Sequence, residues 1–146
     1  RKEGGVLKNI NISNIVATAE SLIACSITGV ETSYVENVSI NNVQISYPGG
    51  GTSDMVSKPV PEMTKSYPEN RMFGMMLPAY GVYIRHADNI RFINMKLSTI
   101  GDKEERHAVV AEDVNGLEIT DSALQSPDSE LSVIRLKDCK NVKVPE

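Results

Sequence analysis

The chain contains few of the residues that mark several common classes of protein. It has no tryptophan, 5% aromatic residues and two cysteines, Cys25 and Cys139, which lie far apart and belong to no Cys/His cluster. This excludes a cysteine-rich structural zinc site, and isolated cysteines of this kind are more often buried thiols than disulfide partners. No apolar run approaches the roughly 20 residues that span a bilayer. With 15 Lys and Arg against 19 Asp and Glu and no basic block, we expect neither nucleic acid nor a membrane as partner.

The residues that are abundant favour strands and turns. Ile and Val outnumber Leu, and Asn is unusually frequent. Branched side chains suit the pleated surface of a sheet, whereas Asn suits turns. The 146 residues are enough for one domain with a core, and the 40% hydrophobic content argues against disorder. The composition therefore predicts an all-β chain, and its start at Arg1, without an initiator Met or a signal-like segment, is expected to be an internal cut or a processed end.

A short motif returns along the chain. An Asn or Gly is followed each time by an apolar residue, any residue and a second apolar residue, as in Asn9-Ile10-Asn11-Ile12. This alternation is typical of a strand with one buried face. We interpret the one spacing of 52 residues as two periods of about 26, with one copy of the motif missing or overwritten. The positions that begin the motif, the register residues, are separated by 28, 52, 27 and 25 residues and are Asn9, Asn37, Asn89, Gly116 and Asn141.

The register residues predict a bend in the backbone. Asn and Gly are the residues that best tolerate a left-handed conformation. If such bends stack one above another, the Asn side chains can form a hydrogen-bonded ladder. We therefore predict a right-handed parallel β-helix, a solenoid of coils of about 26 residues, over a single segment 1–146. A leucine-rich repeat or a β-sandwich is the alternative, but Ile15 and Val43 stand where the former requires Asn.

The repeat is interrupted between about residues 46 and 79. This stretch holds a triple glycine, Gly49–Gly51, several prolines and most of the methionines. Because proline cannot donate to a strand ladder, the segment is predicted to be a long loop at the side of the coils. Its end, Met72–Pro78, is apolar enough that we expect it to pack back onto them. Two interpretations stay open: a solvated excursion, or a loop that lines a ligand groove.

An ordered series of short motifs resembles the C-terminal part of bacterial glycoside hydrolase family 28, the polygalacturonase and rhamnogalacturonase group. The resemblance covers nearly the whole chain. The motifs that carry it are Tyr47-Pro48-Gly49-Gly50-Gly51, Pro61-Glu62, Tyr67-Pro68-Glu69, Met72-Phe73-Gly74, Leu77-Pro78-Ala79-Tyr80-Gly81, Arg85-His86 and Arg106-His107-Ala108.

The resemblance implies a right-handed parallel β-helix that hydrolyses the α-1,4-linked galacturonate chains of pectin with inversion, without metal or cofactor, in the periplasm or outside the cell. Inversion uses one carboxylic acid and one carboxylate base with a water between them. The aspartates, histidine and basic pair that do this in the family precede the part that resembles this chain. Arg1-Lys2 stands too close to Gly4-Gly5 to be that pair. We therefore assign no catalytic residue here and expect the chain alone to be inactive.

Three further groups of carboxylates are candidates for catalysis. Glu104-Glu105, Glu112-Asp113 and Asp128 with Glu130 are close in sequence. Neighbours along a strand point to opposite faces, so these carboxyls are not expected to converge on one bond. Glu104 and Glu105 are expected in a solvated turn, and His107 is expected to be exposed.

Four residues are candidates for binding an acidic sugar: Arg71, Tyr80, Arg85 and His86. Guanidinium grips carboxylate with two parallel hydrogen bonds, and a Tyr ring can stack on a sugar. The alternative for Arg85 and His86 is structural, with Arg85 bridging to a carboxylate or a turn carbonyl and His86 packed between coils.

The expected partner is an acidic plant polysaccharide or oligosaccharide, and the exposed N-terminal coil is expected to associate with a partner chain or with a preceding half. The alternative function is a non-catalytic β-helix that binds polysaccharide or is structural. A polysaccharide lyase is a third possibility, although the acidic Ca²⁺ cluster it would need is not evident.

Overall fold

The computed structural model describes residues 5–66, 69, 71–101 and 103–145. The Arg1-Lys2 pair, Asp102, and Tyr67 and Pro68 of the Tyr67-Pro68-Glu69 motif lie outside these residues. The described part is all-β, with one short helix. Its elements are β1 (Lys8–Thr18), β2 (Cys25–Thr28), β3 (Val35–Tyr47), α1 (Asp54–Ser57), β4 (Ala79–Thr99), β5 (His107–Thr120), β6 (Ala123–Leu124), β7 (Ile134–Lys137) and β8 (Lys140–Lys143).

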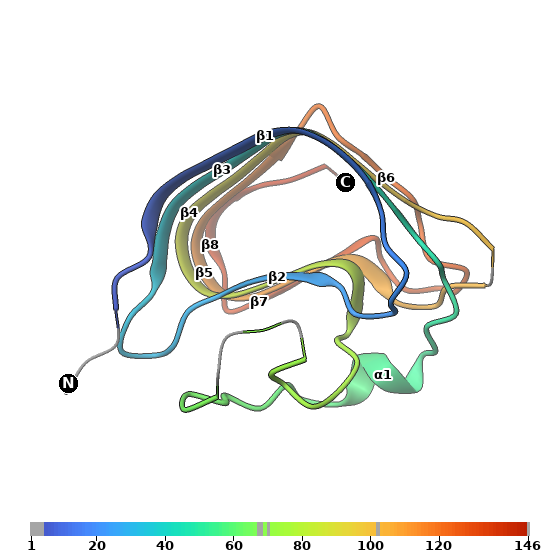
Figure 1. Cartoon of the computed structure of the whole chain (residues 1–146), viewed down its shortest axis with the longest axis horizontal. Coiled ribbons are helices and arrows are strands. Elements are labelled where there is room, and N and C mark those ends of the chain that lie inside the picture. Colours follow the sequence, from blue (N-terminus) through green and yellow to red (C-terminus); the bar gives the residue numbers. More distant parts are fainter. Residues whose placement is uncertain (1–4, 67–68, 70, 102, 146) are drawn as a thin grey trace.

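All the named strands pair in parallel in one sheet. The main path runs β1-β3-β4-β5-β7, while β2 and β6 pair with β4 and β8 pairs with β5. In Figure 1, β1, β3, β4, β5 and β8 lie behind one another along a curved wall, and β2 and β7 lie along the opposite side of the interior. Equivalent residues of the repeat face one another across the sheet. One such column contains Ile10, Val38, Ile90, Leu117 and Val142.

The bend predicted at the register residues is confirmed. Asn9, Asn37, Asn89 and Asn141 have φ between 53° and 58°, and Gly116 has φ 87°. The Asn37 Nδ2 donates to Asn9 Oδ1 at 3.0 Å, and the Asn89 Nδ2 donates to Asn37 Oδ1 at 3.1 Å. The column of amides therefore forms a ladder, in which each side chain donates toward the preceding strand.

A second ladder was not predicted from the sequence. It lies five residues after the first and joins Asn42 to Asn14 at 2.9 Å and Asn94 to Asn42 at 3.1 Å. These three residues also have positive φ, and Asp121, directly after the end of β5, has the same conformation. The long strands are thus bent at regular points by short polar residues, which curves the sheet around its interior.

The interpretation of the 52-residue spacing was wrong. Asn37 and Asn89 are directly hydrogen-bonded, and β3 pairs with β4 from Val35↔Ala87 to Tyr47↔Thr99. No strand lies between them, so no copy of the repeat is missing. The extra residues form the loop 48–78, which leaves after β3 and returns at β4 without shifting the register of the sheet.

The core fills the inside of the curve. Its centre comprises buried residues of β4 and β5, among them Ile84, Phe92, Val109 and Leu117. A second cluster lies under the loop, where Phe73 and Leu77 pack with Tyr83 and Val110. The expectation that the end of the loop packs back onto the sheet is therefore confirmed.

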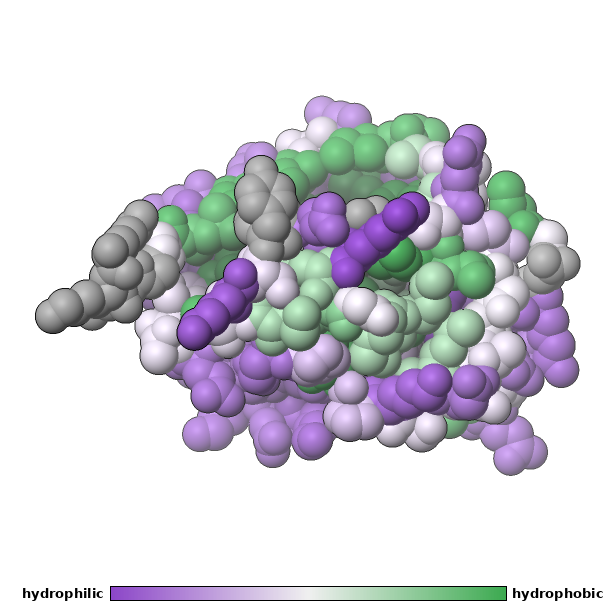
Figure 2. Space-filling view, turned by 60° about the horizontal axis from the view of Figure 1, so that its bottom comes forward, coloured by the Kyte–Doolittle hydropathy of each residue, from purple (hydrophilic) through white to green (hydrophobic). Residues whose placement is uncertain are grey.

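The cysteines are not buried thiols, contrary to the sequence-based expectation. Both are free; Cys25 is exposed and Cys139 is partly exposed. Cys25 begins β2, which pairs with β4 along one edge only in the part of the chain that the structure describes. The same lack of cover leaves Leu7, Ile12 and Val16 exposed near β1, and Figure 2 shows hydrophobic side chains at the surface around a hollow.

Candidate functional site

A groove lies between the loop 48–78 and the adjoining strands. The loop contributes residues 56–60 and Glu62, and the sheet contributes Arg85 and His86 of β4, Glu112 and Asp113 of β5, and residues 135–138. The interpretation that the loop lines a groove is therefore the one that the geometry favours over a solvated excursion.

Arg85 fastens the loop to the sheet. Its guanidinium donates to the carbonyl oxygens of Val60 at 2.7 Å and Pro61 at 2.8 Å, and it lies over the rings of Phe73 and Tyr83. Its side chain is only 5% exposed. Arg85 thus bridges turn carbonyls, as the structural alternative expected, while its buried Nε has no hydrogen-bond partner among the described residues.

His86 lies between two carboxylates. Its Nδ1 is 2.7 Å from an Asp113 oxygen, and its Nε2 is 2.9 Å and 3.2 Å from the Glu62 oxygens. The Tyr34 hydroxyl donates to the same Asp113 carboxylate. The hydrogen bond from Tyr34, followed by that from His86, lowers the pKa of Asp113. In turn, the hydrogen bond to Asp113 raises the pKa of Tyr34 to about 12.

Glu112 and Asp113 do not follow the expectation for neighbours on a strand. Both line the groove, because Asp113 has φ 55° and the backbone turns there instead of alternating. The Tyr83 hydroxyl donates to Glu112 at 3.3 Å, and Arg135 lies 3.5 Å from the other Glu112 oxygen. The groove therefore holds four carboxylates, Glu62, Glu112, Asp113 and Asp138, of which strand alternation had assigned Glu112 and Asp113 to opposite faces.

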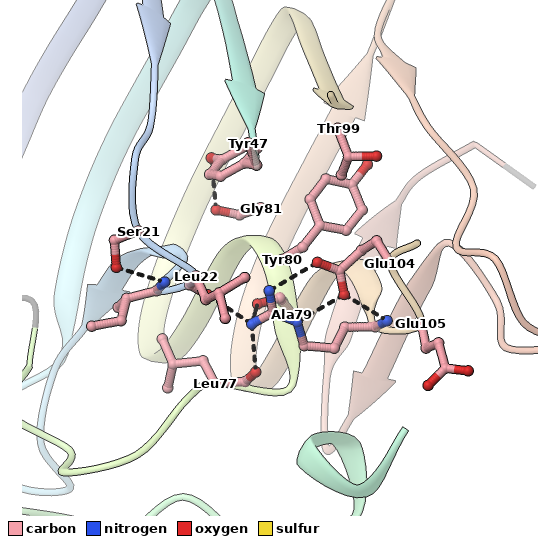
Figure 3. Close-up of polar contacts among 12 residues, drawn as sticks. Ser21, Leu22, Tyr47, Leu77, Ala79, Tyr80, Gly81, Thr99, Glu104 and Glu105 are labelled. Carbon is pink, nitrogen blue, oxygen red and sulfur yellow. Dashed lines mark hydrogen bonds and ion pairs between the residues drawn. The ribbon is translucent and has the colours of Figure 1, made fainter. Parts of the chain in front are cut away.

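A buried ion pair secures the two ends of the loop. Glu104 and Arg106 are each 1% exposed, with Arg106 Nη2 2.9 Å from Glu104 Oε1. Arg106 also donates to the carbonyl oxygens of Leu22 at 2.8 Å and Leu77 at 3.3 Å (Figure 3). A side chain at Gly51 would collide with this pair, so the glycine lets the start of the loop approach it.

The expectations for Glu104 and His107 were therefore wrong. Glu104 is not in a solvated turn, since it supplies the counter-charge for a buried Arg106. His107 is 3% exposed, and its Nδ1 contacts the Ser132 carbonyl oxygen at 2.6 Å. Burial lowers the pKa of His107. The run of charged residues around Glu104 suggested a solvated turn. The contacts that bury the segment come from distant parts of the chain, since Leu22 and Leu77 accept from Arg106 and Ser132 contacts His107.

The structure does not bring the four proposed sugar-binding residues together. Arg85 and His86 line the groove. Tyr80 is 1% exposed and donates its hydroxyl to the Gln125 carbonyl oxygen at 2.7 Å, so its ring faces the core (Figure 3). Arg71 is exposed on the loop and is not among the residues that line the groove.

Three basic residues of the groove were missed: Lys58, Arg135 and Lys137. A signal for Lys137 was present in the repeat. Arg85, Glu112 and Lys137 each stand four residues before a register residue, and they face one another across β4, β5 and β7. Aligning this position would have placed all three side chains in one column beside the loop.

Comparisons with protein-family models, curated proteins and solved structures gave no match to the chain. Within the described residues, no helix has the length and apolar character needed to cross a membrane.

Proposed function

We propose that the chain is the C-terminal portion of a right-handed parallel β-helix from a pectin-type glycoside hydrolase, an inverting enzyme whose catalytic aspartates lie upstream. The fold part of this proposal is supported by the parallel register, in which equivalent motif positions face one another at intervals of 25 to 28 residues outside the loop. It is also supported by the stacked left-handed bends. In a solenoid, each repeat contacts its neighbours and forms a continuous core with them.

The substrate part depends on one observation, the position of two lysines in the groove. Lys58 from the loop and Lys137 from β7 line its two sides. Among the residues that the structure describes, neither has a carboxylate within ion-pair distance. Two ammonium groups without internal partners are suited to the carboxylates of a uronate chain. The activity of the parent enzyme follows from the family resemblance, and the expected location is the periplasm or the extracellular space.

Titration calorimetry with an oligogalacturonate tests this assignment. The Lys58→Gln/Lys137→Gln double variant should weaken binding, on the order of tenfold, since about 1.4 kcal/mol corresponds to that factor. Lys96→Gln is the matched control, because Lys96 is an exposed lysine of β4 outside the groove. A neutral galactan should bind less well than the oligogalacturonate. Equal binding by the double variant would exclude the groove as the uronate site.

Reducing-sugar release from polygalacturonate tests the placement of catalysis. The chain alone should release none, because no paired carboxylates of the family motifs are present in it. Measurable turnover would show that the active site lies within residues 1–146. Binding without turnover, together with a parent chain that lacks aspartate-rich coils before Arg1, would favour the non-catalytic polysaccharide-binding or structural β-helix instead.

A further inference from the structure

A cluster of three potential metal ligands lies at one side of the groove. Glu31, Glu62 and His86 each offer one ligand atom, and these atoms lie within 4.8 Å of one another. They come from three separate segments. Glu31 lies in the turn between Val30 and Ser33, which is closed by two backbone hydrogen bonds of 3.1 Å and 3.0 Å. Glu62 belongs to the loop 48–78, and His86 belongs to β4. The cluster therefore joins parts of the chain that the sheet does not itself connect.

The imidazole of His86 is oriented as a metal ligand would be. Its Nδ1 faces the Asp113 carboxylate, which is itself held by the Tyr34 hydroxyl. A carboxylate on one ring nitrogen is the usual outer partner of a metal-bound histidine, because it fixes the tautomer and turns the other nitrogen toward the ion. His86 is 6% exposed, so packing also limits its rotation.

The contact of His86 Nε2 with Glu62 requires a cation. If Nδ1–H donates to Asp113, Nε2 of a neutral ring carries a lone pair, and the Glu62 oxygens at 2.9 Å and 3.2 Å carry lone pairs too. These acceptors can approach so closely only with a positive charge between them, either a proton or a metal ion. A proton on Nε2 would satisfy the contact with Glu62, but it would leave Glu31 without a role in the cluster.

The surroundings are rich in negative charge. Arg85 Nη1 lies 3.6 Å from Glu62 and is the cation that pairs with this cluster among the described residues. The cluster itself contains the carboxylates of Glu31 and Glu62, and the Asp113 carboxylate contacts His86. Burial, together with the charges of Glu36 and Asp113, raises the pKa of Asp88 nearby. A bound divalent ion would offset this excess of carboxylates.

We propose that Glu31, Glu62 and His86 bind a divalent transition-metal ion of the Zn²⁺ class, which ties the loop 48–78 to the turn at residues 30–33. Zn²⁺ binds both imidazole nitrogen and carboxylate oxygen, whereas Ca²⁺ and Mg²⁺ prefer sites made entirely of oxygen. Glu31 is exposed and the Glu62 side chain is 43% exposed, so an ion can enter from solvent and keep water at its remaining positions. This inference does not depend on the proposed function.

Calorimetry of the full chain, stripped of metal by a chelator, tests the site with ZnCl₂ and with CaCl₂. We expect one Zn²⁺ per chain, little response to Ca²⁺, and a melting temperature that rises with Zn²⁺ concentration as binding to the folded state requires. Loss of an outer partner typically weakens metal binding about 10- to 100-fold, and loss of a ligand should cost at least as much. Glu31→Gln should therefore weaken Zn²⁺ binding by about tenfold or more.

Glu31→Gln is the informative variant because its carboxylate is exposed, so the metal-free protein should melt as the parent does. Glu20→Gln, an exposed carboxylate outside the cluster, is the matched control and should bind Zn²⁺ normally. Substituting Co²⁺ and recording its visible absorption gives a second readout, which should change in Glu31→Gln and not in Glu20→Gln. Absence of stoichiometric Zn²⁺ binding, or equal affinity in the parent and Glu31→Gln, would overturn the proposal and assign the His86–Glu62 contact to a proton.

Discussion

Strands β1 and β4 carry the same motif but have opposite environments. In β1 every residue except Ile10 is exposed, whereas the first nine residues of β4 and most of its later apolar positions are buried. β4 pairs with β3 on one side and β5 on the other, while β1 pairs only with β3 within the described residues. The motif therefore specifies which residues can be buried, and the neighbouring strands decide whether they are.

The largest expected effect lies in the covered region, at its buried ion pair. Glu104→Gln would leave Arg106 without its counter-charge, and breaking such a pair from one side typically costs about 3–5 kcal/mol. The matched control is Glu118→Gln, because Glu118 pairs with Arg91 on the surface, where both side chains are at least 37% exposed. That variant should cost less than about 1 kcal/mol. Urea unfolding of both variants checks this difference, and equal losses would contradict it.

The comparison of β1 with β4 can be tested at matched positions. Ile10 and Ile90 occupy the same column of the sheet and are the same residue type, but Ile90 is 1% exposed and Ile10 is half-buried. Ile90→Ala should lower the free energy of unfolding by about 2–5 kcal/mol. Ile10→Ala should cost about 1 kcal/mol, since less apolar surface is returned to water.

Chemical denaturation at fixed temperature measures both changes. A loss at Ile10 as large as that at Ile90 would show that β1 is covered in solution, for example by another copy of the chain. In that case, sedimentation analysis should reveal the association, and Ile10→Ala should weaken it.

The smallest expected effect is the difference in stability between losing a ladder amide with two hydrogen-bond partners and losing one with a single partner. Asn37→Ala should cost about 2 kcal/mol, because alanine is strained in the left-handed conformation and both ladder bonds are lost. Asn37→Gly should cost about half of that, since glycine keeps the backbone and loses only the bonds. Asn9→Gly should cost less again, because Asn9 has one ladder partner. If the two glycine variants are equally stable, the ladder contributes nothing measurable.

The repeat made much of the fold predictable. Apolar alternation gave the strands, and the restriction of the register positions to Asn and Gly gave the left-handed bends, which the structure confirms. The loop was placed to within two residues, because prolines and glycines mark its ends clearly. These features are local, since each depends on the conformational preference of a residue or on its immediate neighbours.

The contents of the groove were harder to predict. Alternation failed at Glu112-Asp113 because the left-handed Asp113 reverses the direction of its side chain. Glu104 and His107 were misassigned to the surface. Glu104 is buried with Arg106, which is held by the carbonyl oxygens of Leu22 and Leu77, and His107 contacts the Ser132 carbonyl oxygen, so the contacts that bury this segment come from far away in the sequence. Contacts of this kind depend on which strands become neighbours. The loop 48–78 rejoins the sheet without changing its register, so the spacing of the motif in the sequence does not reveal that β3 and β4 are adjacent.

The two Asn ladders give the stack a polarity. Each amide donates toward the N-terminal side and accepts from the C-terminal side, so Asn9 and Asn14 present N–H donors beyond β1. At the other side, Asp121 holds the left-handed position that follows Asn94, but a carboxylate has no N–H to donate and the second ladder ends there. The two faces of the stack are therefore chemically unlike. A strand added next to β1 would fit best if it carried two side-chain carbonyl groups five residues apart. The opposite face presents acceptors in both columns, the Asn141 carbonyl and the Asp121 carboxylate, and would reject such a row.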